Sequence, residues 1–307
     1  MRSYRRKKEI ARKKRNKEMG KFIIPITALI AVFLGFLYYC FTPHVWNGKD
    51  KLSLTIQRIS GDVSVVIFDP RLNEETTLTI PGNTEVNVAE NLGRLTVKNV
   101  WKLGQDQKVD GRLLSETVTK NFLFPSSVWS DPKAESLINP TLPGLAKFIF
   151  GGGGTNLGIF DKFSLSLFSL KVKAVDRSEI DLGKSQFLKK GKLSDGSSGF
   201  TLSGDIAERL TANFSDYGFS GRLVRIFIKD ETGILGVSDS VGQILEVMGG
   251  KVVSIDKLSS VDADCTVSGG DPGLIIKVSR LFSCKTSTGG GKDDIELTLG
   301  SKFAKRF

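Results

Sequence analysis

The stretch LVRIFIKDETGILGVSDSVGQILEVMGGKVVSI, residues 223–255, contains the patterns of a strand, a turn, a helix and a second strand in order. Residues 223–228 are rich in β-branched and aromatic side chains, which favour a strand, and residues 230–233 are typical of a turn. The next apolar residues recur at the spacing of one helix face, and Gly249-Gly250 ends the pattern. They are Val237, Val241, Ile244, Leu245 and Met248. Residues 251–255 predict the following strand.

The residues after this stretch predict one more helix and a final strand. Asp271 can cap the helix by accepting hydrogen bonds from its first free N–H groups, and Pro272 suits the first helical position. The helix would bury Leu274, Val278, Leu281 and Phe282. An alternating strand at 295–299 follows. The order β-α-β-β-α-β-β predicts an α/β sandwich of about 85 residues.

The region upstream predicts another mixed α/β sandwich. The expected elements are strands at 52–56, 62–68, 76–80, 86–88 and 95–100 and a helix over 111–122. Turn signals at Asp69-Pro70 and Pro81-Gly82-Asn83 mark the second and third strands as a hairpin. Three prolines and a four-glycine run predict loops at 126–154. Residues 157–182 recover apolar character, and 189–199 predict a polar connector.

The uncharged run FIIPITALIAVFLGFLYYCF, residues 22–41, predicts a transmembrane helix, because about 20 apolar residues cross ~30 Å of hydrocarbon. Residues 1–21 hold eleven Lys and Arg and two Glu, and such a cluster stays cytoplasmic. A cleaved signal peptide and a buried core helix are the alternatives. A signal peptide has a shorter apolar region of ~7–15 residues and a cleavage site of small residues, which this run lacks.

The expected fold class is therefore α/β, with one N-terminal transmembrane helix followed by two exported mixed α/β sandwich domains. The parts are a basic cytoplasmic tail at 1–21, a transmembrane helix at 22–41, a first domain at 52–188, a connector at 189–221 and a second domain at 222–307. We expect a single-pass protein of the cell membrane with a cytoplasmic N-terminus and an extracytoplasmic C-terminus.

The net charge of +11 is concentrated before the predicted span. Beyond residue 21 the chain carries 33 basic and 31 acidic residues, so the exported part is nearly neutral. Nucleic-acid binding needs a strongly basic surface, and we expect no nucleic-acid partner.

The residue types available exclude several kinds of catalytic site. His44 is the single histidine and lies just after the predicted span, so neither a Ser-His-Asp triad nor a multi-histidine metal site can form. The remaining carboxylates and arginines are scattered, and solvated surface positions are the simplest explanation for most of them.

The cysteines divide between membrane and exterior. Cys40 falls in the predicted span, whereas Cys265 and Cys284 flank the helix that begins at Pro272. An exported pair can oxidise, and a helix that returns beside its preceding strand brings such ends together. We expect a Cys265–Cys284 disulfide; the alternative is two small buried apolar side chains.

Several motifs together resemble the LytR-CpsA-Psr (LCP) family of envelope proteins. They are DVSVVIFDP at 62–70, LTIPGNT at 78–84, the helical pattern from Leu114 to Phe122 and NLGIFD at 156–161. The last 85 or so residues resemble the separate LytR C-terminal domain, whose Asn-Gly-Thr-Gly turn reads Asp230-Glu231-Thr232-Gly233 here.

The resemblance implies an activity whose residues are mostly absent. Active members transfer a wall polymer from a polyprenyl-pyrophosphate lipid to peptidoglycan, with arginines on the pyrophosphate and an aspartate near Mg²⁺. The family's Ile-Pro-Arg-Asp turn is Ile80-Pro81-Gly82-Asn83 here, and Ser60 stands where an arginine is expected. Only Asp62 matches a functional carboxylate, as a possible remnant of the metal and phosphate site. Arg94 or Arg112 could replace the missing arginines from elsewhere in the fold.

These features favour a non-catalytic LCP-like envelope protein, without a cofactor, that binds or scaffolds wall-polymer assembly. Its expected partners are membrane lipid, through the single helix, and a wall glycan, a lipid-linked precursor or another envelope protein. The alternative is a divergent Mg²⁺-dependent phosphotransferase that attaches a polyprenyl-pyrophosphate-linked polymer to peptidoglycan. A signalling regulator would need a cytoplasmic module, which 21 residues cannot form.

Overall fold

The computed structural model describes residues 33, 35, 44–203, 208–287, 289, 291 and 294–307. It divides into two units, Met1–Val45 and Trp46–Phe307. The tail expected at 1–21, Cys40 and nearly all of the span expected at 22–41 lie outside the described residues. Among the helices within those described ranges, none has the length and hydropathy to cross a bilayer.

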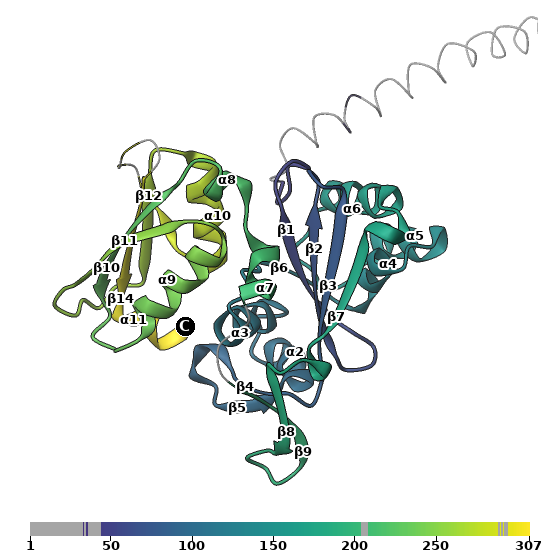
Figure 1. The fold of residues 1–307 in the computed structure, drawn as a ribbon, viewed down its shortest axis with the longest axis horizontal. Coiled ribbons are helices and arrows are strands. Elements are labelled where there is room, and N and C mark those ends of the chain that lie inside the picture. The colour runs from purple at the N-terminus through teal and green to yellow at the C-terminus, as the bar shows by residue number, and fades with distance from the viewer. Residues whose placement is uncertain are drawn as a thin grey trace, which may run out of the picture. The chain divides into compact units, whose positions relative to one another are not determined.

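A five-stranded mixed sheet organises the first part of Trp46–Phe307, in the order β6-β1-β2-β3-β7 (Figure 1). Its strands are β1 Leu52–Gln57, β2 Val63–Asp69, β3 Glu74–Ile80, β6 Val128–Ser130 and β7 Arg177–Asp181. Strands β2 and β3 form the hairpin that the sequence predicts, and β1 also pairs antiparallel with β2. The outer strands β6 and β7 run parallel to β1 and β3.

Helices cover both faces of this sheet, and every residue of β2 is therefore buried (Figure 1). The helices are α2 Val97–Asp106 and α3 Arg112–Phe122 on one face, and α4 Glu135–Ile138, α5 Leu142–Phe150 and α6 Ile159–Lys171 on the other. Alternate residues of a strand point to opposite faces. Val65 accordingly belongs to the core with Val118 of α3, whereas the ring of Phe68 meets Phe168 of α6 edge to face at 6.0 Å.

The prediction of a strand at 95–100 is correct for residues 95–96 and wrong for residues 97–100. Strand β5 (Arg94–Thr96) pairs with β4 (Glu85–Asn87), and the chain then enters α2. Val97 and Val100 are both buried on α2, because residues three apart lie on one helix face.

The loops expected at 126–154 are also wrong, because this segment contains β6, α4 and α5. Pro143 lies in the first turn of α5, where its missing N–H costs nothing. Thr141 caps the helix by accepting a hydrogen bond from the Gly144 N–H at 3.3 Å. Proline here begins a helix and does not break one.

The polar connector expected at 189–199 forms an antiparallel hairpin. Strand β8 (Leu188–Lys192) pairs with β9 (Ser198–Leu202), and the short helices α7 (Glu208–Thr211) and α8 (Tyr217–Ser220) follow. Phe187 and Leu188 anchor the hairpin in the core beneath the first sheet.

The C-terminal part forms a second five-stranded sheet in the order β11-β10-β14-β12-β13. Its elements are β10 Arg225–Glu231, α9 Val237–Val247, β11 Lys251–Lys257, β12 Cys265–Gly269, α10 Pro272–Phe282, β13 Lys285–Thr286, β14 Asp294–Gly300 and α11 Ser301–Arg306. The predicted order of strands and helices is confirmed, with α11 added after it. Asp271 caps α10, since its Oδ1 accepts from Gly273 N at 2.8 Å and Leu274 N at 3.2 Å.

A disulfide joins Cys265, the first residue of β12, to Cys284, which follows α10. Their Cα atoms are 4.9 Å apart, and both side chains are buried. This is the pair expected from the sequence.

Candidate functional site

Asp62 lies in the turn between β1 and β2, where its carboxylate joins two loops. Its Oδ1 accepts a hydrogen bond from Gly82 N at 2.8 Å, and its Oδ2 accepts one from Ser60 Oγ at 2.9 Å. The turn itself is closed by a hydrogen bond from Arg58 N to the Asp62 carbonyl at 2.9 Å. Both carboxylate oxygens are therefore engaged by groups of the protein.

Gly82 is packed so closely that no side chain fits there without movement of the backbone. A Cβ atom at this position would lie 2.5 Å from the carbonyl oxygen of Gly61. The surrounding loop is held by hydrogen bonds from Thr84 N to Pro81 O at 2.9 Å and from Lys98 N to Gly82 O at 3.1 Å. The arginine that the family carries at this position has no space in this arrangement.

Arg58 is the arginine nearest to Asp62 in the chain, and carboxylates neutralise it. Its guanidinium lies 4.0 Å from Glu135 and 3.7 Å from Glu179. Glu135 also accepts a hydrogen bond from Ile59 N at 2.6 Å. A pyrophosphate would meet two acidic groups beside this one guanidinium, and like charges oppose binding.

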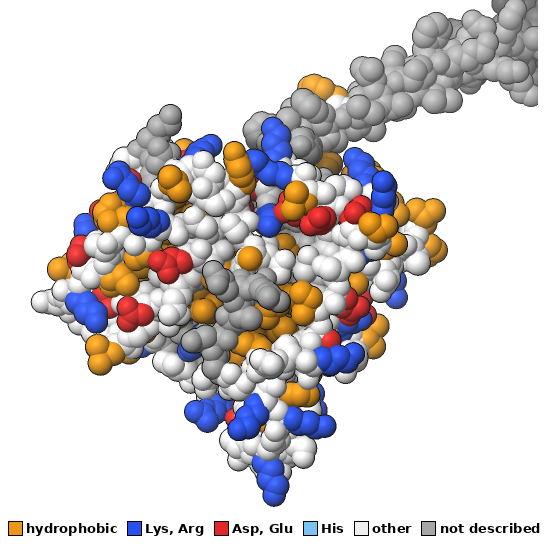
Figure 2. Space-filling model, viewed as in Figure 1, with side chains coloured by type: hydrophobic (Ala, Val, Ile, Leu, Met, Phe, Trp, Pro, Cys, Tyr) orange, Lys and Arg blue, Asp and Glu red, His pale blue; other side chains and the backbone are white. Residues whose placement is uncertain are grey.

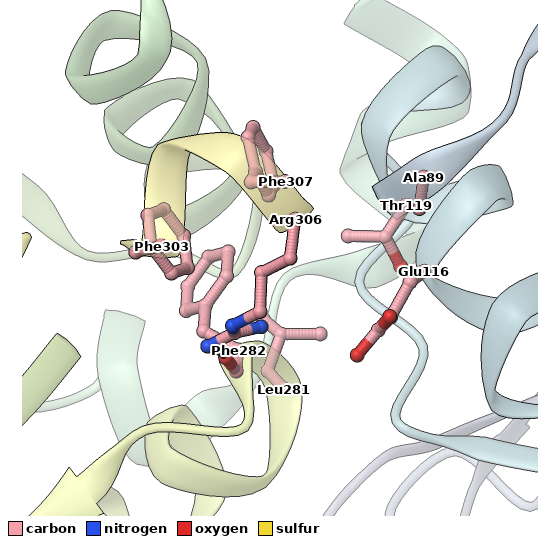
Figure 3. Close-up of a pocket in the computed structure, with 8 residues that line it drawn as sticks. All are labelled: Ala89, Glu116, Thr119, Leu281, Phe282, Phe303, Arg306 and Phe307. Atoms are coloured by element: carbon pink, nitrogen blue, oxygen red, sulfur yellow. Dashed lines mark hydrogen bonds between the residues drawn. The ribbon is translucent and has the colours of Figure 1, made fainter. Parts of the chain in front are cut away.

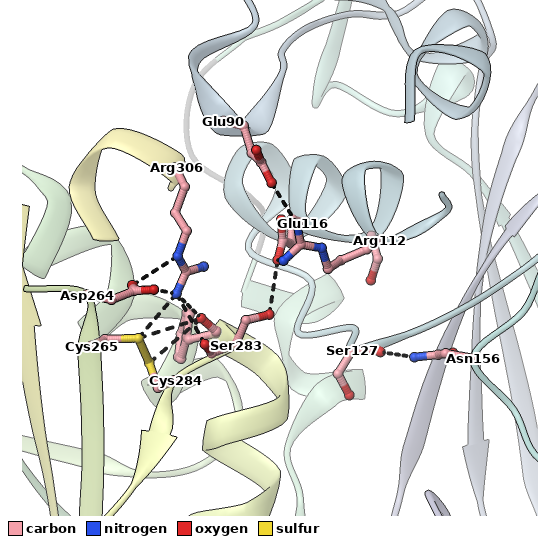
Figure 4. Close-up of polar contacts among 12 residues, drawn as sticks. Glu90, Arg112, Glu116, Ser127, Asn156, Asp264, Cys265, Ser283, Cys284 and Arg306 are labelled. Carbon is pink, nitrogen blue, oxygen red and sulfur yellow. Dashed lines mark hydrogen bonds and ion pairs between the residues drawn. A yellow bond between two sulfur atoms is a disulfide. The ribbon is translucent and has the colours of Figure 1, made fainter. Parts of the chain in front are cut away.

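The two arginines considered as replacements are engaged elsewhere; Figure 4 shows Arg112 beside its partner Glu90. Arg94 donates to Asn87 Oδ1 at 3.2 Å. Arg112 lies 2.8 Å from Glu90 and 3.8 Å from Glu116 on its own helix. Within the described ranges, no ion pair joins Asp62 to a lysine or arginine. The residues at this turn therefore do not fit a Mg²⁺–pyrophosphate site.

A small pocket separates α3 from the C-terminal helices (Figure 3). Its space is about 10 Å³, room for about one water molecule. Ser283 Oγ donates to Glu116 Oε1 at 3.2 Å, and Arg306 is held by Asp264 at 3.0 Å and by the Phe282 carbonyl at 2.7 Å (Figure 4). Burial raises the pKa of Glu116, although Arg112 and Arg306 oppose the shift. These contacts connect two parts of the fold and leave no room for a substrate.

A larger cleft of about 230 Å³ opens beside the end of the β2–β3 hairpin and α8. The guanidinium of Arg71 lies 3.6 Å from the centre of the Tyr217 ring, and Lys51 pairs with Asp69 at 3.1 Å. Asp50, Leu72, Ser215 and Ser220 complete its lining. The sequence contains no signal for this cleft, because Arg71 and Tyr217 come from segments far apart in the chain.

No protein-family model matches this chain, and no curated protein matches its sequence. Solved structures do match it. A LytR-CPS2A-psr family protein, YwtF (TagT), solved with bound octaprenyl pyrophosphate lipid, is 16% identical with a TM-score of 0.36, and the match covers 52% of this chain and 87% of that one. TagV from B. subtilis is 11% identical with a TM-score of 0.37, over 52% and 92% of the two chains. TagT bound to LIIa-WTA is 14% identical with a TM-score of 0.30, over 52% and 88%.

Proposed function

We propose that this chain is a membrane-anchored envelope protein with an LCP-like domain that binds or scaffolds wall polymer without catalysing its transfer. The anchor is the apolar run at 22–41, with the basic tail on the cytoplasmic side. The observation that carries the non-catalytic role is the closed Asp62–Gly82 contact. The carboxylate of Asp62 joins its own turn to the loop at Gly82, and the close packing of Gly82 leaves no space there for a phosphate-binding arginine.

The cleft at Arg71 and Tyr217 offers chemistry suited to a hydroxyl-rich glycan. Asp50 and Asp69 carry acceptors, Lys51 and Arg71 carry donors, and Ser215 and Ser220 can do both. The side chain of Tyr217 is 54% exposed, so its ring is accessible at the surface. Pockets that combine a few placed polar groups with an aromatic ring are typical binding sites.

The decisive test of the non-catalytic role is a transfer assay on the full chain. Purified protein with a polyprenyl-pyrophosphate-linked wall polymer, peptidoglycan and Mg²⁺ should transfer no polymer above background. The double variant Ser60→Arg, Gly82→Arg should remain inactive, because the side chain at 82 collides with the Gly61 carbonyl. Transfer by the unaltered protein would establish the divergent phosphotransferase instead.

The binding role is tested with soluble wall glycan and the full chain in detergent. Tyr217→Ala and Arg71→Ala should each weaken glycan binding measured by calorimetry, whereas Arg94→Ala, outside the cleft, should not. If all three variants bound the glycan with the affinity of the unaltered protein, glycan recognition would lie outside this cleft.

A further inference from the structure

Helices α5 and α6 expose large apolar side chains in addition to the apolar side chains that they bury. The exposed residues, here called the α5/α6 apolar face, are Leu142, Phe150, Ile159, Phe163, Leu167 and Leu170. The four on α6 follow the spacing i, i+4, i+8 and i+11, so they share one helix face, and each is between 43% and 50% exposed. Leu165 and Phe168 are buried on the opposite face. In Figure 2, hydrophobic side chains stand on the surface at the outer edge over α5.

The charges beside this face are of one sign. Residues 141–175 contain four lysines, Lys147, Lys162, Lys171 and Lys173, and a single acidic residue, Asp161. Asp161 is 1% exposed and accepts a hydrogen bond from Trp46 N at 3.2 Å, so it contributes little charge to the surface. Apolar residues flanked by lysines are the pattern of helices that lie on anionic lipid bilayers.

Helix α6 is also tied to the part of the chain that follows the predicted span. The backbone N–H of Trp46 donates to Asp161, and the ring of Trp46 packs edge to face on Phe168, with ring centroids 5.6 Å apart. The predicted span ends at Phe41, and five residues reach at most about 17 Å. Under the proposed anchoring, this short connection limits how far Trp46, and the helix on which it packs, can lie from the bilayer.

We propose that the α5/α6 apolar face lies in the interfacial layer of the outer leaflet, with the neighbouring lysines on anionic phospholipid headgroups. This inference rests on the proposed membrane anchoring. The bilayer surface would cover apolar area that the protein leaves exposed, and the lysines would pair with lipid phosphates.

Site-directed spin labelling of the full chain in nanodiscs of phosphatidylcholine and phosphatidylglycerol tests the proposal. Cys40→Ser leaves the Cys265–Cys284 disulfide intact and allows one label per variant. Labels at F163C and L167C should collide several-fold more with oxygen, relative to a water-soluble nickel complex, than a label at L235C. Leu235 is the matched control, an apolar residue that is 87% exposed on the C-terminal part.

The outcomes separate this inference from the anchoring on which it rests. A label at L29C, within the predicted span, reports whether the anchor lies in the bilayer. If this label is accessible to nickel, both the anchoring and the surface contact are refuted. If L29C is protected while F163C and L167C match L235C, the anchor stands and the surface contact is refuted. Dipolar broadening between copies at F163C would also refute it, because a second copy would then cover the face. In nanodiscs without phosphatidylglycerol, the ratio of oxygen to nickel collisions at F163C should fall. An unchanged ratio would refute the role of the lysines.

Discussion

At the scale of single residues, Asp62 is a structural carboxylate. It connects the turn at Ser60 to the backbone of Gly82, twenty positions later in the chain. A carboxylate that accepts hydrogen bonds from a hydroxyl and an N–H stabilises the loops it joins, as a cap stabilises a helix end. Its position resembles that of the family's aspartate, and in this structure its two oxygens accept hydrogen bonds from Ser60 and Gly82.

Asp62→Asn should change stability little, whereas Asp62→Ala should lower the free energy of unfolding by about 1 kcal/mol. The asparagine oxygen can still accept from Gly82 N, and its amide can donate to Ser60 Oγ. Alanine removes both contacts. Urea unfolding followed by circular dichroism measures the difference.

Asp195→Ala is the control for this pair of variants. Asp195 also accepts hydrogen bonds from a nearby serine, Ser197, but it is fully exposed, so its loss should have less effect. If Asp62→Asn abolished a measurable polymer transfer while leaving the fold intact, the non-catalytic role would be wrong.

Glu75 predicts a pH dependence of stability. It is 2% exposed, and burial raises its pKa from 4.5 to about 7 despite Arg177, whose guanidinium is 2.8 Å away. The folded state therefore binds this proton more tightly than the unfolded state. The free energy of unfolding should rise as the pH falls from above 7 towards 4.5, by up to ~3 kcal/mol, and level off below.

Glu75→Gln should flatten this pH dependence, because the amide does not titrate. Thermal melts of both proteins between pH 4.5 and pH 8 provide the measurement. Parallel curves for the two proteins would show that Glu75 has the same pKa in the folded and unfolded states.

At the scale of elements, the disulfide fastens α10 to the strand before it. The bridge spans 19 positions, from the start of β12 to the residue before β13. It adds to packing, because Val267, Val278 and Phe282 from the same elements are already buried in one core. The bridge thus restricts the unfolded chain more than it shapes the folded one.

Reduction of the disulfide should lower the free energy of unfolding by ~3 kcal/mol, the value that chain entropy predicts for a loop of this length. The double variant Cys265→Ser, Cys284→Ser should behave like the reduced protein, whereas Cys40→Ser should match the unaltered one. Denaturant unfolding with and without reductant gives the comparison. Equal stability of the oxidised and reduced proteins would contradict the prediction.

At the scale of the whole molecule, the proposed topology rests on charge placed before an apolar run. A reporter enzyme that works only outside the cytoplasm should be active when it is fused after Phe307. External protease should digest this reporter in cells without an outer barrier. The positive-inside bias is the physical reason. Replacing the basic residues of 1–21 with glutamine should weaken this orientation, and a reporter that stays protected in the unaltered protein would overturn it.

The elements of the C-terminal part, residues 222–307, follow from local patterns in the sequence. The helix face from Val237 to Met248, the Asp271 cap and the closing strand at 295–299 all depend on residues within a few positions of one another. Such interactions form wherever the chain folds locally. The same locality explains the errors: Pro143 and Thr141 begin a helix, but prolines next to glycines also occur in loops.

The candidate site depended on tertiary structure. Asp62 alone could be chosen from the sequence, but its partner Gly82 N, the neutralisation of Arg58 by Glu179 and the meeting of Arg71 with Tyr217 are set by strand pairing and packing across distant segments. The apolar character of residues 157–182 was visible in the sequence, although the helix α6 was not predicted there. Whether a face of this helix would be buried or exposed was decided only by packing, in which Leu165 and Phe168 are buried and Ser169 donates to the Leu137 carbonyl, because a periodic pattern identifies a face without saying what covers it.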